Sequence, residues 1–173
     1  MTVTAESLST AFPDALHGVS PDGIPYILVR PEQLVETVRR CRDELDYVRW
    51  VDMTAVDEPE VEPRFELQYL LYSMVEHRWV RLKTQTDDTV PSIVSVFAGA
   101  NWYEREVFDL FGIIFEGHPN MTRLMMPDDW EGHPQRKDYP VQIRKAVQTY
   151  EPLEISEEEF RANLERDRLK RTH

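Results

Sequence analysis

The 173-residue chain has the length of one domain with a further segment, and its 32 acidic and 20 basic residues give a net charge of -12. Such an acidic chain repels the phosphates of nucleic acids, so nucleic acid is not expected as a partner. The single cysteine excludes an internal disulfide and any iron–sulfur or zinc site built only from cysteines of this chain. The longest uncharged run, residues 89–103, is shorter than the roughly 20 apolar residues of a membrane-spanning helix, and residues 1–10 lack the pattern of a secretory signal.

The first part of the chain predicts two helices and one strand. Residues 5–12 have helical apolar spacing, residues 13–23 are rich in turn formers, and residues 24–29 have strand character. Pro31 suits the first turn of a second helix, whose apolar face includes Cys41. We therefore expect Cys41 to be a core residue and not a nucleophile.

Three consecutive strands are predicted next, over residues 47–56, 65–75 and 78–86. Their hairpin order predicts an antiparallel sheet. With the helices on either side in the sequence, the expected fold class is α+β, an antiparallel sheet flanked by helices.

A third amphipathic helix follows Asn101. Asn101 and Glu104 have the spacing of a capping box, which gives Glu104 a structural role, and Gly112 is expected to end the helix. Arg105 and Asp109 stand four residues apart, so the sequence predicts an ion pair between them. Glu106 has no oppositely charged partner at helical spacing.

Regular periodicity stops between residues 116 and 150, although this segment is rich in apolar and aromatic residues. An extended chain with anchoring side chains is typical of a segment that lies on another subunit. We therefore predict a core domain over residues 1–117 and an extended docking arm over residues 118–173. The arm is predicted to end in a charged helix that begins at Ser156 and runs to about Leu169.

A metal site is an alternative interpretation of part of this segment. Four residues within a short stretch are ligand types for zinc or another divalent metal, and they would suit a small metal-dependent hydrolase. They are His118, Asp128, Asp129 and His133.

Residues 100–141, ANWYEREVFDLFGIIFEGHPNMTRLMMPDDWEGHPQRKDYPV, closely resemble the signature region of the thirty-kilodalton (C-type) subunit family of respiratory complex I. Many relatives carry an aspartate and a further base where this chain has Asn120 and Thr122. The positions that match the family signature, and are predicted to lie at subunit interfaces, are Glu104, Arg105, Glu106, Asp109, Gly112, His118, Pro119, Arg123, Trp130, Arg136, Lys137 and Asp138.

The resemblance implies a non-redox component of the proton-pumping NADH:quinone oxidoreductase, a translocase, that scaffolds the quinone-reducing module and is needed for assembly and for electron transfer to quinone. It implies no catalytic residue and no cofactor on this chain, with FMN, iron–sulfur clusters and quinone held by other subunits. The implied partners are the quinone-site (forty-nine-kilodalton type) subunit and neighbouring iron–sulfur subunits. The implied location is the cytoplasmic face of the cell membrane, with membrane contact only through the complex. The alternative within this lineage is the equivalent subunit of a membrane-bound hydrogenase or of a dehydrogenase with another electron donor.

Overall fold

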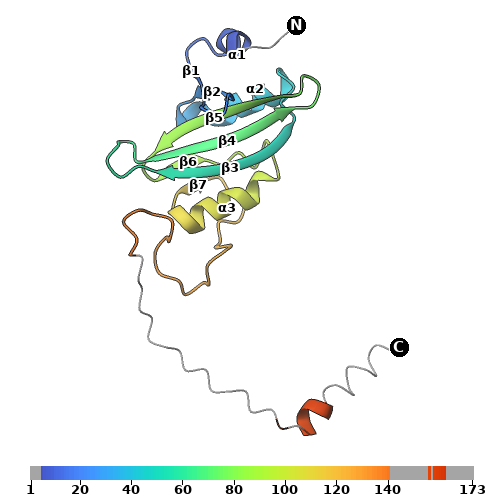
Figure 1. Cartoon of the computed structure of the whole chain (residues 1–173), viewed down its shortest axis with the longest axis vertical. Helices are drawn as coiled ribbons and strands as arrows, with labels where there is room; N and C mark the ends of the chain where they lie inside the picture. Colours follow the sequence, from blue (N-terminus) through green and yellow to red (C-terminus); the bar gives the residue numbers. More distant parts are fainter. Residues whose placement is uncertain (1–4, 141–155, 157, 163–173) are drawn as a thin grey trace, which may run out of the picture. The chain divides into compact units, whose positions relative to one another are not determined.

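The computed structural model describes residues 5–140, 156 and 158–162 (Figure 1). The chain divides into two compact units, Met1–Pro140 and Val141–His173. In the second unit, residues 158–162 are helical and the Glu159 amide donates to the Ser156 hydroxyl oxygen over 3.2 Å, the predicted cap. The rest of the predicted terminal helix lies outside the described residues. Within the described ranges, no helix is long and apolar enough to cross a lipid bilayer.

The helices of the first half occur where apolar spacing predicts them. Helix α1 spans Ala5–Ala11, and the 3-10 turn η1, Pro31–Gln33, leads into α2, Leu34–Asp43. Helix α2 buries Leu34, Val38 and Cys41 on one face, so Cys41 is the predicted core residue.

The main sheet contains five strands in the order β1-β2-β5-β4-β3. The three longest strands, β3 (Arg49–Asp57), β4 (Phe65–Ser73) and β5 (Arg78–Thr86), are antiparallel neighbours, as their hairpin order predicts. Strand β2, Pro25–Leu28, instead pairs in parallel with β5. The sheet is therefore mixed and not wholly antiparallel, because the chain crosses over from β2 through α2 to β3 at the far edge, which leaves β2 beside β5.

Strand β1, Leu16–Val19, lies in the stretch predicted to be turns. Its four residues are too few, with a glycine among them, to show a strand alternation in the sequence. It pairs antiparallel with β2 and forms the edge of the sheet opposite β3.

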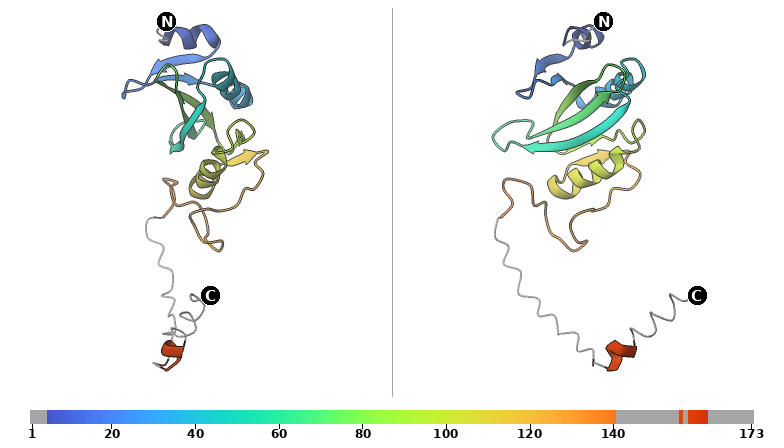
Figure 2. Two further views of the ribbon diagram at one scale, coloured as in Figure 1. Left: turned by 90° about the vertical axis from the view of Figure 1, so that its right-hand side faces the viewer. Right: turned by 45° about the vertical axis from the view of Figure 1, so that its right-hand side comes forward.

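Only one face of the central sheet is fully buried. Along β4, buried residues alternate with half-buried ones, so Phe65, Leu67, Tyr69 and Leu71 face the core. Figure 2 shows α2 and α3 (Ala100–Phe111) beside the sheet. Helix α3 lies next to β3, and its Val107 belongs to the core.

A small second sheet positions α3. Strands β6 (Thr89–Pro91) and β7 (Ile114–Glu116) pair in parallel on either side of the helix in sequence. Gly112, with φ of 79°, ends α3 in the left-handed conformation, as predicted, and the chain then enters β7 at once.

The first unit extends beyond the predicted domain boundary at residue 117. Residues 118–140, which we name the return segment, leave β7 and run back along α3 (Figure 1). The backbone amide of Gln135 donates to the Leu110 carbonyl over 3.0 Å. This part of the predicted arm is therefore internal structure of the first unit.

Candidate functional site: helix α3 and the return segment

Glu104 is a buried acid and does not form the predicted capping box. Helix α3 starts after Gly99 without a side-chain cap, and Glu104 is fully buried. Its carboxylate accepts from the Ser92 hydroxyl over 2.6 Å and from the Ile93 amide over 2.7 Å. Burial raises the pKa of Glu104 to about 7, although both donors act in the opposite direction. Glu104 thus fixes α3 to the segment that follows β6.

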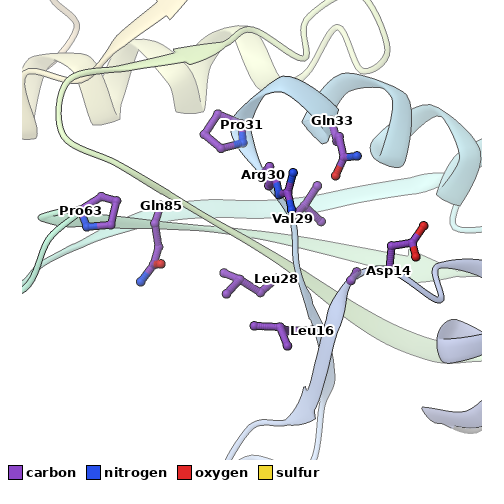
Figure 3. A pocket seen from close by; sticks show the side chains of 10 residues that line it. Asp14, Leu16, Leu28, Val29, Arg30, Pro31, Gln33, Pro63 and Gln85 are labelled. Carbon is purple, nitrogen blue, oxygen red and sulfur yellow. The ribbon is translucent and has the colours of Figure 1, made fainter.

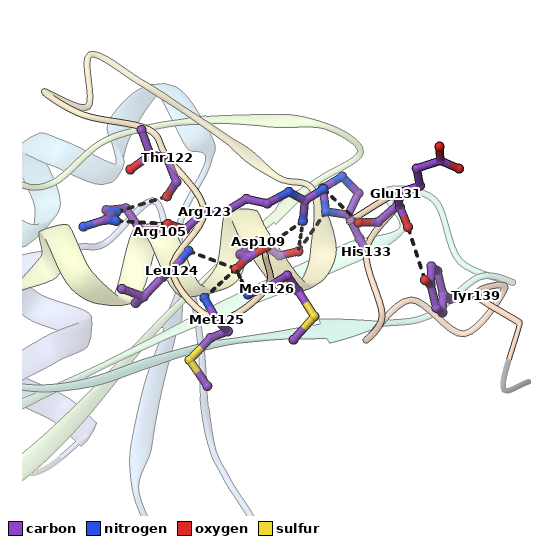
Figure 4. Close-up of polar contacts among 11 residues, drawn as sticks. Arg105, Asp109, Thr122, Arg123, Leu124, Met125, Met126, Glu131, His133 and Tyr139 are labelled. Carbon is purple, nitrogen blue, oxygen red and sulfur yellow. Dashed lines mark hydrogen bonds and ion pairs between the residues drawn. The ribbon is translucent and has the colours of Figure 1, made fainter. Parts of the chain in front are cut away.

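Asp109 organises the start of the return segment (Figure 4). Although it lies within α3 and has no exposed surface, its Oδ2 accepts from three successive amides, those of Leu124, Met125 and Met126, at 2.9, 2.6 and 2.8 Å. Its Oδ1 accepts from Arg123 over 2.6 Å. Burial acts to raise the pKa of Asp109, but these four donors outweigh it and lower the pKa below its ordinary value.

Arg105 does not pair with Asp109, so the predicted helical ion pair is wrong. The Arg105 guanidinium donates to the carbonyl oxygens of Thr122 and Arg123, both over 3.1 Å (Figure 4), and lies over the Trp102 ring. The ion pair of Asp109 is instead with Arg123, 14 residues later in the chain. Arg105 and Asp109 therefore hold the same stretch of the return segment from two positions on one helix.

The C-terminal end of α3 binds the later part of the return segment. His133 donates from Nδ1 to the Asp109 carbonyl over 2.9 Å, and Arg136 donates from Nε to the Phe111 carbonyl. A Cβ atom on Gly112 would lie 2.5 Å from the His133 ring and 2.8 Å from Arg136 Nη2. Gly112 is thus required both for its backbone conformation and for this close approach.

A second buried aspartate, which the sequence analysis missed, fixes the end of the return segment. Asp57, at the end of β3, is 5% exposed and accepts from Arg64 at 2.6 and 2.8 Å and from the Lys137 amide at 2.7 Å. Arg64 also donates to Asp138 at 3.0 and 3.1 Å. The Arg64 guanidinium lowers the pKa of both aspartates, for Asp57 against the effect of burial. In sequence, Asp57 and Arg64 flank an acidic loop, and nothing there indicates a partner about 80 residues away.

The remaining signature residues have smaller roles in the described contacts. His118 donates from Nε2 to the Asn101 carbonyl and accepts from the Asn120 amide, which links the start of α3 to the turn after β7. Trp130 is half-buried, and Pro119 and the Lys137 side chain are exposed. The Glu106 side chain makes no hydrogen bond or ion pair with another residue of the described ranges.

The proposed metal ligands do not converge. His118 and His133 each bind a backbone carbonyl, and Asp128 and Asp129 are exposed. Within residues 5–140, 156 and 158–162, no three His, Cys, Asp or Glu side chains are placed to hold a metal ion.

A cavity of about 730 Å³ lies away from α3, between β1, β2 and the loop before β4 (Figure 3). Leu16, Leu28, Pro31 and Gln85 are among its lining residues. None of the signature residues lines it. Among the signature residues, Arg105, Asp109 and Arg123 direct their polar groups at contacts between α3 and the return segment, whereas Glu106 lines a smaller cavity of about 200 Å³.

A family model and individual relatives of this chain all belong to one family of respiratory subunits. A family model described as the 30 Kd subunit of respiratory-chain NADH dehydrogenase matches residues 27–145. The C subunit of NADH-quinone oxidoreductase from Roseiflexus sp. (strain RS-1) is 42% identical over 151 residues, which covers 84% of this chain and 87% of that protein. The combined C/D polypeptide of NADH-quinone oxidoreductase from Methylococcus capsulatus is 42% identical over 153 residues, which covers 82% of this chain but 26% of that protein.

Two solved structures have the same fold. A trypsin-resistant fragment of Nqo5 superposes with a TM-score of 0.61 at 21% identity and covers 69% of this chain and 99% of the fragment. A chain of the membrane-bound sulfane sulfur reductase, an archaeal respiratory membrane complex, superposes with a TM-score of 0.68 at 26% identity and covers 79% of this chain and 83% of that one. These likenesses confirm the α+β fold class.

Proposed function

Because this chain belongs to the family of the 30 Kd subunit of respiratory-chain NADH dehydrogenase, we propose that it is a non-redox scaffold of an NADH:quinone oxidoreductase on the cytoplasmic face of the membrane. The membership confirms the resemblance seen in residues 100–141. The scaffold role covers assembly of the quinone-reducing module and electron transfer to quinone through other subunits, which would hold FMN, the iron–sulfur clusters and quinone.

The chemistry of this chain supports a non-redox role. Its one cysteine cannot supply the four thiolates of a typical iron–sulfur cluster. Cys41 is also buried, and burial raises the pKa of its thiol to about 12, which disfavours the thiolate that binds metals.

The main observation in support of the proposal is that Asp109 fixes the backbone of the return segment through hydrogen bonds. Three successive amides and one guanidinium converge on this carboxylate, so the backbone of residues 124–126 is held in one geometry. The Met125 side chain nevertheless remains 58% exposed, and Trp102, beneath Arg105, is 60% exposed. Large apolar side chains on a preorganised backbone are typical of a protein interface, because little conformational freedom is lost on binding.

The proposed partner is the quinone-site subunit. The relative from Methylococcus capsulatus is named for two subunits, C and D, and this chain matches only 26% of its length. A polypeptide that combines both subunits favours their being neighbours in the complex, and we propose that the second of them is the quinone-site subunit. Iron–sulfur subunits next to it are the further partners proposed.

A second candidate is the equivalent subunit of a respiratory complex with another electron donor. The likeness to a chain of the archaeal sulfane sulfur reductase favours it, since that complex has the same fold in one of its subunits. The NADH-linked relatives are closer in sequence, at 42% against 26% identity, so we favour the NADH:quinone oxidoreductase.

The test is co-purification of the quinone-site subunit with the tagged full-length chain from native membranes. Met125→Glu places a charge on the proposed interface without altering the Met125 amide, so it should strongly reduce recovery of that partner. The matched control is Leu16→Glu, at a side chain that is 69% exposed on the distant edge strand β1, and it should leave recovery unchanged. Equal recovery with both variants would contradict docking through the return segment.

A further inference from the structure

A second cavity, of about 400 Å³, lies at the end of the sheet where the β1–β2 turn approaches the β4–β5 turn. Its volume falls within the range of roughly 300–1,000 Å³ that is typical of small-molecule sites. Apolar and aromatic side chains provide much of the wall, among them Leu8, Val19, Ile24, Tyr47 and Trp79. Val19 and Trp79 are 59% and 41% exposed, so the cavity is open to solvent.

Arg78 contributes a cationic group with unused hydrogen-bonding capacity to this wall. Its Nη1 atom is buried and has no hydrogen-bond partner among the described residues. Its Nη2 atom lies 3.7 Å from a Glu76 carboxylate oxygen, which is beyond hydrogen-bond distance. A buried guanidinium N–H without an acceptor is unfavourable, so an anionic or carbonyl oxygen at this position would be stabilising.

The acids nearby leave that N–H available. Asp22, which also lines the cavity, accepts from Arg81 over 2.7 Å and from the Ile24 amide over 3.2 Å. Glu76 is partly exposed and approaches only the other nitrogen of Arg78. Neither Asp22 nor Glu76 accepts a hydrogen bond from Arg78 Nη1.

Polar contacts fix the wall formed by the β4–β5 turn. Asp46 accepts from the Ser73 hydroxyl over 2.9 Å and from the Val75 amide over 3.3 Å. His77, in the left-handed region with φ of 53°, has its Nδ1 3.1 Å from the Tyr72 hydroxyl. The wall is therefore shaped before any ligand binds, which favours a specific site.

From this geometry we infer that the cavity binds a small carboxylic acid with an apolar or aromatic body. The carboxylate would accept from Arg78 Nη1, since carboxylates are strong acceptors from guanidinium groups, and the body would lie against Tyr47 and Trp79. The site is separate from the signature residues around α3 and does not depend on the proposed scaffold function.

The test uses 3-phenylpropionate as the probe and the full-length protein labelled with ¹⁵N. Titration should shift the Trp79 indole N–H signal, identified by its loss in Trp79→Phe, in a saturable manner. Arg78→Gln should weaken binding by about tenfold or more, the size expected for a lost hydrogen bond to a charged group. The matched control is Arg39→Gln, which removes an exposed guanidinium from α2 and should leave the affinity unchanged.

A second measurement keeps the inference testable if Arg78→Gln fails to fold. On the unaltered protein, 3-phenylpropionamide has the same body without the charge and should bind about tenfold more weakly than the acid. A short peptide ending in phenylalanine would bind more tightly than the free acid if the natural source of the carboxylate is a polypeptide terminus. Equal affinities for acid and amide, or no shift of the Trp79 signal, would overturn the inference.

Discussion

Asp109 and Arg123 form an ion pair of 2.6 Å between the middle of α3 and the return segment, and the aspartate has no exposed surface. This pair lies at the centre of the signature region, because the same carboxylate also accepts from three backbone amides. The pair matters first for stability, since loss of the Asp109 charge would leave the partly buried Arg123 guanidinium without its carboxylate partner and weaken all four hydrogen bonds.

We expect Asp109→Asn to lower the free energy of unfolding of the chain by about 3 kcal/mol or more, the scale of a broken buried ion pair. Chemical denaturation followed by circular dichroism measures this change. The control is Asp129→Asn, at an exposed position of the return segment, which should alter the free energy by less than about 0.5 kcal/mol. Similar effects of the two substitutions would show that Asp109 does not hold the return segment.

Glu104 should make the free energy of unfolding fall as the pH rises, the opposite of the effect of the buried aspartates. Its pKa rises from an ordinary value of 4.5 to about 7 in the folded protein, so folding favours the protonated carboxyl. The stability it contributes is full below about pH 4.5, declines as the pH rises, and is lost above pH 7, a total of about 3 kcal/mol. Asp57 and Asp109, with lowered pKa values, instead contribute stability that is lost in acid.

Comparison of the unaltered protein with Glu104→Gln isolates the loss of stability that Glu104 causes as the pH rises. Glutamine keeps an oxygen for the Ile93 amide and cannot ionise, so the variant should lack this decline between about pH 4.5 and pH 7. The stability difference between the unaltered protein and the variant should therefore shift in favour of the variant as pH rises. A constant difference across this range would contradict a raised pKa for Glu104.

Two glycines with the same φ separate backbone strain from steric clash. Gly112 and Gly117 both have φ of 79°, but an added Cβ would meet His133 at 2.5 Å only at Gly112 and would meet no atom within 4 Å at Gly117. Gly117→Ala should therefore lower the free energy of unfolding by about 1–2 kcal/mol, the strain of a left-handed non-glycine residue. Gly112→Ala should lower it clearly further, because the return segment must also move. Thermal melts of both variants test this, and equal losses would show that His133 does not pack closely on Gly112.

The sequence could predict those features that depend on local spacing. The hairpin strands, the apolar face of α2 and the glycine that ends α3 all follow from periodicity or from backbone preference. The pairing of Arg105 with Asp109 was predicted by the same local rule and is wrong, because a helical spacing of four residues permits a contact without requiring it.

The features that sequence reasoning missed depend on segments that meet only after folding. Glu104 finds its donors 11 and 12 residues earlier in the chain, and Asp57 accepts from an amide 80 residues later. The return segment has no periodicity because buried carboxylates of other elements, and not a ladder of its own, hold its backbone. Its lack of pattern therefore predicts an arm, whereas residues 118–140 belong to the first compact unit.

The last prediction concerns where the chain can be cut. The sequence predicts that the core domain ends at Gly117, but truncation there would remove Arg123 and the amides that bind Asp109, together with the Lys137 amide that binds Asp57. Two buried carboxylates would lose donors in one step. A chain of residues 1–117 should therefore unfold at a much lower temperature than the full-length protein, or without a cooperative transition.

A chain of residues 1–140 retains all of these contacts and should melt cooperatively, within a few degrees of the full-length protein. Thermal unfolding followed by circular dichroism distinguishes the two, and a cooperative 1–117 chain of unchanged stability would show that the return segment is a docking element that the core does not need.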